Sequence, residues 1–169
     1  MSLIFIIVSA AVLLFGFVVA FGAPYVPSLG KEVRNAFKEL FPISDKDTVV
    51  DLGSGDGSVL LAASKAGAHC VGVELNPALV IISRLRLGKR AEIRLGNMWL
   101  MELPPQTTLV YAFVVSRDTK RLKKYMHAEA NRLKKDITLM TFGAMLPDIK
   151  PLRIRKAHSL YVFRPLQAD

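Results

Sequence analysis

Three alternating glycines directly after a short apolar stretch constrain the fold of this chain more than any other feature. The stretch Thr48–Leu52 suits a buried strand, and Gly53, Gly55 and Gly57 follow it before a helical pattern begins at Ser58. Glycine lets the backbone turn sharply and lets a ligand approach without a Cβ in the way. The helix N-terminus leaves amide donors free, with a partial positive charge. A strand, glycine turn and helix in this order therefore predict a place for a carboxylate or a phosphate.

Beyond the glycine turn, apolar patterns typical of strands and helices alternate along the chain. Strands are predicted over residues 48–52, 69–73, 91–95, 107–114 and 137–142, and a closing hairpin over residues 152–156 and 159–164. Helices are predicted over residues 29–41 and 58–66, after a cap at Asn76, and along a buried stripe of Leu122, Met126, Ala130 and Leu133. Repeated β-α-β units imply helices on both faces of a parallel sheet. The predicted fold class is α/β, a mostly parallel doubly wound sheet with an antiparallel hairpin at one edge.

The second predicted strand ends in an acid, Glu74, 17 residues after Gly57. In doubly wound sheets an acid at this place accepts hydrogen bonds from ribose hydroxyls, which predicts a cofactor that contains adenosine. The glycine spacing is G-x-G-x-G, with Ser58 where the third glycine of the dinucleotide motif G-x-G-x-x-G would stand. Asp51, just before the glycines, disfavours a pyrophosphate; it could orient the turn and accept the ammonium of an amino-acid-like ligand. These features favour S-adenosylmethionine (SAM) over NAD.

Both segments resemble motifs of a known family. Residues 51–57 resemble the first SAM-binding motif of class I methyltransferases, and residues 73–77 resemble the second. Together with residues 24–27 (Pro-Tyr-Val-Pro) and 97–99 (Asn-Met-Trp), they are similar to one subgroup. That subgroup is the membrane-anchored lysine methyltransferases of the ATP synthase c subunit and the adenine nucleotide translocase, with their prokaryotic relatives. The resemblance spans roughly residues 24–99 and implies a Rossmann-like class I methyltransferase fold.

The resemblance also implies where SAM would bind. The glycine turn would hold its methionine end, Glu74 its ribose, and residues 97–99 would flank its adenine. The family usually has an acid where Asn97 stands. Residues 24–27 would either cover the cofactor or form only a rigid exit from the preceding helix. The residues implied in cofactor binding are Asp51, Gly53, Ser54, Gly55, Asp56, Gly57, Glu74, Leu75, Asn76, Asn97, Met98 and Trp99.

The reaction implied is an in-line displacement at the sulfonium methyl group, in which the enzyme mainly aligns the nucleophile and excludes water. No catalytic base is assigned. Asp56 is the nearest acid in the motif, and a cap on the following helix explains it equally well. Residues 113–117, after the fourth strand, lack the Asn/Asp-Pro-Pro-Tyr/Phe signature of methyltransferases that act on nucleobase amines. That absence argues against DNA adenine as the substrate.

The N-terminal segment differs in composition from the rest of the chain. Residues 2–30 contain no charged side chain, and the apolar run over residues 3–23 would form a helix roughly 31 Å long, enough to cross a bilayer. We therefore predict a transmembrane helix over residues 1–23, a junction with an amphipathic helix over residues 24–47, and a SAM-dependent methyltransferase domain over residues 48–169. A cleaved secretory signal is the alternative. The basic residues that follow, Lys31, Arg34 and Lys38, place the domain on the cytoplasmic side or its organellar equivalent.

The charge balance is strongly basic, with a formal net charge of +9. Residues 117–135 hold eight basic and two acidic side chains, which predicts a helix face that lies against anionic lipid headgroups or is simply solvated. Tyr125 is the only aromatic residue in this segment apart from the histidine, so nucleic acid is not expected as a partner. The single cysteine, Cys70, and three scattered histidines show no metal-ligand spacing, and no metal is expected.

These expectations combine into one leading function. The chain is expected to be a membrane-anchored, SAM-dependent methyltransferase, and the resemblance implies that its substrate is a lysine of a membrane protein. The first alternative is a methyltransferase for a lipid, a quinone or another small molecule. The second is a catalytically inactive SAM-binding membrane protein.

Overall fold

The computed structural model describes residues 2–9 and 30–166 of the chain. Residues 3–9 are helical, and the large apolar side chains from Leu3 to Val8 are exposed. Within the described residues, no helix combines the length and apolar character needed to cross a bilayer. Residues 10–29 lie outside the described part, so the transmembrane helix over residues 1–23 and the junction at residues 24–27 stay predictions.

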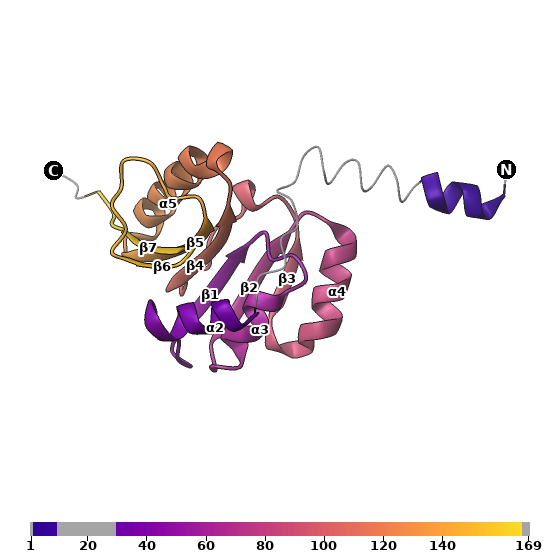
Figure 1. The fold of residues 1–169 in the computed structure, drawn as a ribbon, viewed down its shortest axis with the longest axis horizontal. Helices are drawn as coiled ribbons and strands as arrows, with labels where there is room; N and C mark the ends of the chain where they lie inside the picture. The colour runs from indigo at the N-terminus through magenta and orange to yellow at the C-terminus, as the bar shows by residue number, and fades with distance from the viewer. Residues whose placement is uncertain (1, 10–29, 167–169) are drawn as a thin grey trace.

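The described residues form a seven-stranded sheet in the order β3-β2-β1-β4-β5-β7-β6 (Figure 1). The strands are β1 (Thr48–Leu52), β2 (His69–Glu74), β3 (Glu92–Leu95), β4 (Leu109–Val114), β5 (Ile137–Gly143), β6 (Arg153–Arg155) and β7 (His158–Phe163). The helices are α2 (Gly30–Glu39), α3 (Ser58–Ser64), α4 (Pro77–Leu87) and α5 (Thr119–Leu133), with short 3₁₀ turns η1 (Gly88–Arg90), η2 (Met98–Leu100) and η3 (Ser116–Asp118). The predicted α/β class is confirmed.

Strand direction and order define where a ligand can bind. Strands β1 to β5 run parallel, while β7 is antiparallel to both β5 and β6, so the predicted closing hairpin does lie at one edge. The chain moves outward from β1 through β2 to β3, and then returns to place β4 on the other side of β1. This reversal opens a crevice at the carboxyl ends of β1 and β4, the usual ligand site of doubly wound sheets.

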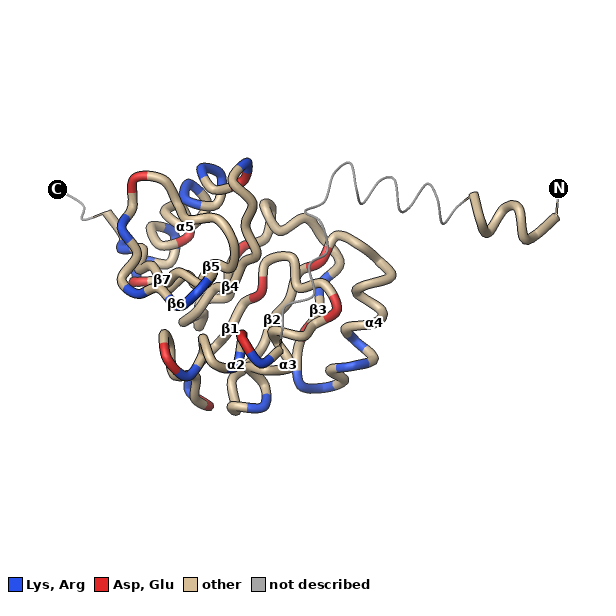
Figure 2. Tube along the Cα trace, viewed as in Figure 1, with Lys and Arg blue, Asp and Glu red and all other residues tan. Residues whose placement is uncertain are grey.

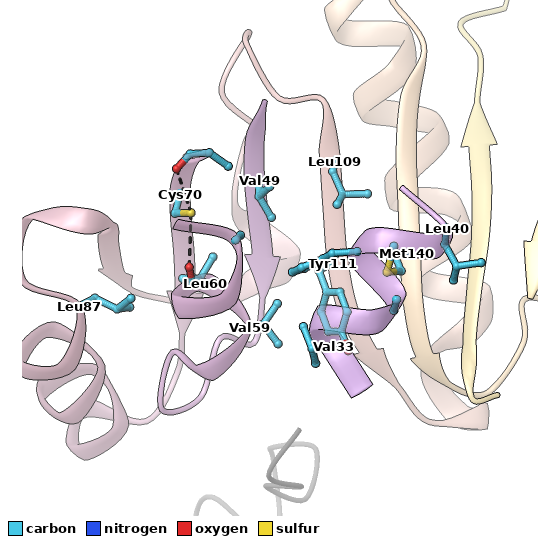
Figure 3. Close-up of a cluster of buried hydrophobic side chains, with 14 of the residues drawn as sticks. Val33, Leu40, Val49, Val59, Leu60, Cys70, Leu87, Leu109, Tyr111 and Met140 are labelled. Carbon is cyan, nitrogen blue, oxygen red and sulfur yellow. Dashed lines mark hydrogen bonds between the residues drawn. The ribbon is translucent and has the colours of Figure 1, made fainter. Parts of the chain in front are cut away.

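The two faces of the sheet are covered unequally. Helices α2, α3 and α4 cover one face, where Val33, Leu60 and Leu87 belong to the same buried cluster as the β1 and β4 side chains Val49 and Tyr111 (Figure 3). Cys70 lies in this cluster, and its thiol donates to the Leu60 carbonyl oxygen at 3.6 Å. Burial raises the pKa of the Cys70 thiol to about 12, so this cysteine is structural.

The opposite face is covered by α5 and by two connections without α-helix. Leu122, Met126 and Ala130 of α5 are buried against β4 and β5, as the apolar stripe predicts. Leu103, in the connection from β3 to β4, and Leu146, in the connection from β5 to β6, complete this cluster. Helices lie on both faces as predicted, but a single helix leaves two loops to shape the rest of this face.

Alternation along β1 decides which side chain reaches which layer. Val50 and Leu52 join the cluster under α5, while Val49 joins the cluster under α2, α3 and α4. Because side chains alternate along a strand, Asp51 belongs to the same face as Val49. All five positions of β1 are buried, which is typical of a central parallel strand.

Candidate functional site

The glycine turn after β1 needs backbone conformations that other residues rarely adopt. Gly53, Gly55 and Gly57 have φ values of 82°, 53° and 79°. Gly57 is also a packing position, because a Cβ there would lie 2.6 Å from Leu87 Cδ1 and 3.1 Å from Ser83 Cβ of α4. Gly53 is exposed, and a Cβ there would have Met98 Sδ as its nearest neighbour, at 3.8 Å. The turn therefore has an open side at Gly53 and a packed side at Gly57.

Glu74 holds the glycine turn in place. Its Oε2 accepts a hydrogen bond from the Gly55 N–H at 2.8 Å, and its Oε1 accepts one from the Asn76 N–H at 2.8 Å. The Val73 carbonyl oxygen accepts from the N–H groups of Gly53 and Ser54 at 2.9 and 3.0 Å. A carboxylate has about four acceptor positions, so two remain for the ribose hydroxyls that the sequence assigns to this acid. Glu74 thus joins the turn to the predicted ribose position.

Asp51 is buried near the end of β1, two residues before the first glycine of the turn. Burial is the main cause that raises the pKa of its carboxyl to about 8, and the negative charges of Glu74 and Asp56 raise it further. The carboxyl is therefore protonated at neutral pH when no cation lies beside it. A cationic ligand group at this place would favour the carboxylate, in keeping with the expected ammonium.

Ser54 contributes its backbone to the turn, while its side chain packs inward. A Cβ on Gly72 would lie 2.7 Å from Ser54 Oγ, so the hydroxyl sits over the glycine of β2. This Oγ is buried, and it has no hydrogen-bond partner among the described residues. Its side chain points into the layer between the sheet and α3, away from the open side at Gly53.

Asp56 forms contacts that suit a structural cap. Its Oδ1 accepts from the Ser58 N–H at 3.1 Å at the start of α3, and its Oδ2 forms an ion pair with Arg86 of α4. Arg86 also donates to Ser58 Oγ at 2.9 Å. These contacts favour the capping interpretation of Asp56 over a catalytic one.

Two asparagines cap the elements that border the site. Asn76 Oδ1 accepts from the Ala78 N–H at 2.9 Å, which confirms the predicted cap of α4 with Pro77 in its first position. Asn97 Oδ1 accepts from the Trp99 N–H at 3.1 Å and starts η2. Its amide nitrogen is the group left to meet an adenine edge. Leu75 is exposed between Glu74 and Asn76, at the edge of the sheet.

One stripe of α5 fixes residues 99–103, which follow Asn97 and Met98. The Arg121 guanidinium lies 4.5 Å from the centroid of the Trp99 ring, and Tyr125 donates to the Met101 carbonyl oxygen at 2.8 Å. Glu129 Oε2 accepts from the Leu103 N–H at 2.7 Å. Arg132 donates to the Leu103 carbonyl oxygen at 2.7 Å and pairs with Glu129 at 2.5 Å. This α5 stripe (Arg121, Tyr125, Glu129 and Arg132) therefore fixes residues 99–103, which begin at the last residue of the predicted adenine segment.

The α5 stripe changes the interpretation of the basic segment over residues 117–135. Arg121 and Arg132 were expected on a lipid-facing or solvated face, yet both bind the neighbouring loop. The spacing of the stripe at intervals of four, four and three residues is a helical signal that the sequence contained. Its partner, the loop at residues 99–103, could not be identified without the tertiary structure.

An aromatic cluster lies on the neighbouring strands β4, β5 and β7. Tyr111 Oη and His158 Nε2 are hydrogen bonded at 3.0 Å, and Phe142 packs against the His158 ring with centroids 4.8 Å apart. Phe113 stacks at a tilt on Phe142 at 6.0 Å. Burial, with a smaller effect of the Arg155 charge, lowers the pKa of His158 to about 4. The cluster is therefore an uncharged, mostly apolar wall, and sequence reasoning missed it because its members are far apart in the chain.

Within the described residues, no group of three or more His, Cys, Asp or Glu side chains could hold a metal ion. The site is defined by a glycine turn, one acid that organises it and a buried acid whose pKa is raised by burial.

The family model, the curated relatives and the solved structure that resemble this chain are all methyltransferases. The ANTKMT methyltransferase domain matches residues 51–153. A lysine N-methyltransferase of the ATP synthase c subunit from Xenopus laevis is 51% identical over 111 residues, which cover 63% of this chain and 48% of that protein. A protein-lysine N-methyltransferase of Saccharolobus islandicus is 34% identical over 113 residues, which cover 63% of this chain and 69% of that protein. The chain thus spans about half the length of the ATP synthase methyltransferases that it matches.

A solved structure supports the fold. The RNA methyltransferase of Salinibacter ruber, crystallised with S-adenosyl-L-homocysteine, superposes with a TM-score of 0.72 at 22% identity. The match covers 85% of this chain and 97% of that chain. The predicted class I methyltransferase fold is confirmed.

Proposed function

The chain belongs to the ANTKMT methyltransferase domain family, and on that premise we propose that it is a SAM-dependent protein-lysine N-methyltransferase whose substrate is a membrane protein. The observation that carries the proposal is the Gly55–Glu74 hydrogen bond, which joins the turn after β1 to the acid at the end of β2. This bond supports a cofactor site at the carboxyl ends of the strands, where doubly wound sheets bind their ligands, with Glu74 as the acid predicted to bind ribose. The substrate class rests on the names of the relatives in Xenopus laevis and Saccharolobus islandicus.

The residues present fit SAM. The open face of Gly53 would admit the methionine end, and the buried Asp51 would gain a cation as its neighbour. The free acceptor positions of Glu74 would bind the ribose hydroxyls. Residues 97–99, in which Asn97 caps η2 and Trp99 lies against Arg121 of the α5 stripe, would flank the adenine. When bound, SAM supplies a methyl group that its sulfonium has already activated.

The remaining work of the protein is to present a neutral amine in line with that methyl group. Lysine is charged at neutral pH, and transfer into an apolar environment favours its neutral form. Phe113 and Phe142, the partly exposed members of the aromatic cluster, provide such an environment near the carboxyl ends of β4 and β5. Alignment beside this wall and exclusion of water are the contributions that this chain's residues make to the reaction.

We further propose that residues 1–23 anchor the domain and that it lies on the cytoplasmic side or its organellar equivalent. The uncharged segment before residue 31 and the basic residues after it support this topology. An anchor would hold the site at a constant distance from a membrane-embedded substrate, which raises its effective concentration.

The test uses membranes from cells that lack the protein and the purified full chain with methyl-labelled SAM. Label in a membrane protein, mapped by mass spectrometry to a lysine side chain, is the expected result. Glu74→Gln should strongly reduce the label when SAM is held near the wild-type dissociation constant. Glu92→Gln, at an exposed acid at the start of β3, serves as the matched control. Label found only in the lipid extract would replace the lysine proposal with a lipid methyltransferase. Bound SAM without any labelled product would point to an inactive SAM-binding protein.

A further inference from the structure

Three large apolar side chains project from the carboxyl edge of the sheet, around the proposed cofactor site. Leu75 follows β2, Leu100 ends the turn η2 after β3, and Met145 lies two residues after β5. They are 39%, 80% and 54% exposed. The three strands are members of the parallel part of the sheet, so their carboxyl ends lie at one edge. What these three share is the carboxyl edge of the sheet, and exposed apolar side chains along one edge can take part in an interaction surface.

Basic side chains flank the same edge. Helix α5 follows β4, so its N-terminal end starts there, and Figure 2 shows basic positions in the first half of α5. Lys120 and Lys124 are exposed. Among the described residues, Arg117 forms an ion pair with Asp118 and Lys123 forms one with Asp148, but neither Lys120 nor Lys124 forms an ion pair. The first half of α5 therefore presents positive charge beside the exposed apolar side chains.

A cavity continues this basic surface toward the connection between β5 and β6. Its volume is about 340 Å³, and it is lined by Lys120, Lys123, Lys124, His127, Pro147 and Asp148. Lys123 Nζ donates to the Pro147 carbonyl oxygen at 3.3 Å and lies 3.6 Å from the Asp148 carboxylate. Three lysines face one acid, and this balance suits a phosphate group. Tyr161 Oη accepts from the Leu146 N–H at 3.1 Å and holds the loop that carries Met145.

We infer that the rim formed by Leu75, Leu100, Met145, Lys120 and Lys124 lies on the surface of an anionic lipid bilayer. The apolar side chains enter the boundary between headgroups and acyl chains, and the basic side chains bind lipid phosphates. The rim surrounds the carboxyl ends of the strands, so this orientation turns the cofactor site toward the membrane. The inference deepens the proposed function, because it explains how a membrane-embedded substrate reaches the site, but lipid contact itself does not depend on methyl transfer.

Trp99 provides a probe in the full chain, because it is the only tryptophan and it packs under Arg121 beside the rim. The full chain is reconstituted into phosphatidylcholine vesicles that contain brominated lipid as the quencher. One set of vesicles also contains about 30% phosphatidylserine, which makes the vesicle surface strongly negative. We expect bromine quenching of Trp99 that requires phosphatidylserine and is reversed by high salt. The double variant Lys120→Glu/Lys124→Glu should lose the phosphatidylserine-dependent part of the quenching.

The matched control is Lys46→Glu/Lys65→Glu, which makes the same change in charge at two exposed lysines near the amino ends of the strands. It should retain the quenching, and both variants should bind SAM with unchanged affinity, which shows that they are folded. Lys120→Gln/Lys124→Gln should show an intermediate loss.

Three results for the quenching would overturn the inference: its absence, its independence of phosphatidylserine, or an equal reduction in Lys120→Glu/Lys124→Glu and Lys46→Glu/Lys65→Glu. A second result would also overturn the inference: the variant Lys120→Glu/Lys124→Glu keeps its quenching but fails to methylate a detergent-solubilised protein. The two lysines would then bind an acidic protein and not lipid. A failure of methyl transfer with quenching intact in the wild type would count only against the proposed function.

Discussion

The backbone N–H of Gly55 donates to Glu74 Oε2 at 2.8 Å, which joins the turn after β1 to the acid at the end of β2. The same carboxylate accepts from the Asn76 N–H through its other oxygen at 2.8 Å. One side chain therefore fixes the glycine turn, the start of α4 and the proposed ribose position. Changes at Glu74 should affect the cofactor site as a unit.

Glu74→Gln should weaken SAM binding by about 10- to 100-fold, the usual effect of losing charge-assisted hydrogen bonds. A glutamine side chain has only one acceptor oxygen, so its amide nitrogen would face the N–H of either Gly55 or Asn76. Calorimetric titration of the full chain measures the change, with Glu92→Gln as the control. An unchanged dissociation constant would show that the cofactor does not use this acid.

Gly57→Ala should destabilise the domain more than Gly53→Ala. The two glycines have similar φ values of 79° and 82°, so the conformational cost of about 1–2 kcal/mol is shared. Only at Gly57 would the new methyl group meet α4, at 2.6 Å from Leu87 Cδ1 and 3.1 Å from Ser83 Cβ, which adds about 1–3 kcal/mol. Thermal unfolding without SAM compares the two variants, and equal midpoints would contradict the close packing of α3 on α4.

Asp51→Asn should stabilise the cofactor-free domain at alkaline pH. The folded pKa of Asp51 is raised from 3.8 to about 8, so the folded state keeps its proton while the unfolded state loses it. Wild-type stability should therefore fall as pH rises through this window, by an amount of order 2–5 kcal/mol. Unfolding midpoints measured from pH 5 to pH 9 should converge at the acidic end and separate at the alkaline end. Parallel curves for the two proteins would mean that Asp51 is ionised in the folded state.

His158→Gln should remove a pH dependence of stability whose sign is opposite to that caused by Asp51. The folded pKa of His158 is lowered from 6.5 to about 4, so the unfolded state binds the proton first as pH falls. Wild-type stability should decline between pH 6.5 and pH 4, by roughly 2–3 kcal/mol. Glutamine can keep a hydrogen bond to Tyr111 without titrating. The unfolding midpoint of the His158→Gln protein should therefore vary less over this range than that of the wild type. Because Asp51 acts in the opposite direction over the same range, the double variant Asp51→Asn/His158→Gln separates the two effects. A decline in His158→Gln as steep as in the wild type would show that the ring is not the group responsible.

The sequence by itself determined the order of strands and helices, because apolar spacing and local capping act within a few residues. The buried stripe of α5, the Asn76 cap and the closing hairpin were all predicted from such short-range patterns. The glycine turn and Glu74 were likewise predicted as a cofactor site, since β-α-β connectivity brings the carboxyl ends of successive strands together.

Only the tertiary structure decided how distant side chains divide their roles. In the structure Glu74 holds the turn, a role that the sequence suggested for Asp51, and the Ser54 hydroxyl lies inward over Gly72. The structure also pairs Tyr111 with His158, 47 residues away, and places Arg121 and Arg132 on the loop before β4. These contacts depend on which faces meet after the sheet forms, and a local pattern contains no information about the partner. The membrane anchor and its topology are predicted from the composition of residues 1–23, because the length and apolar character of a segment predict a membrane span without reference to tertiary contacts.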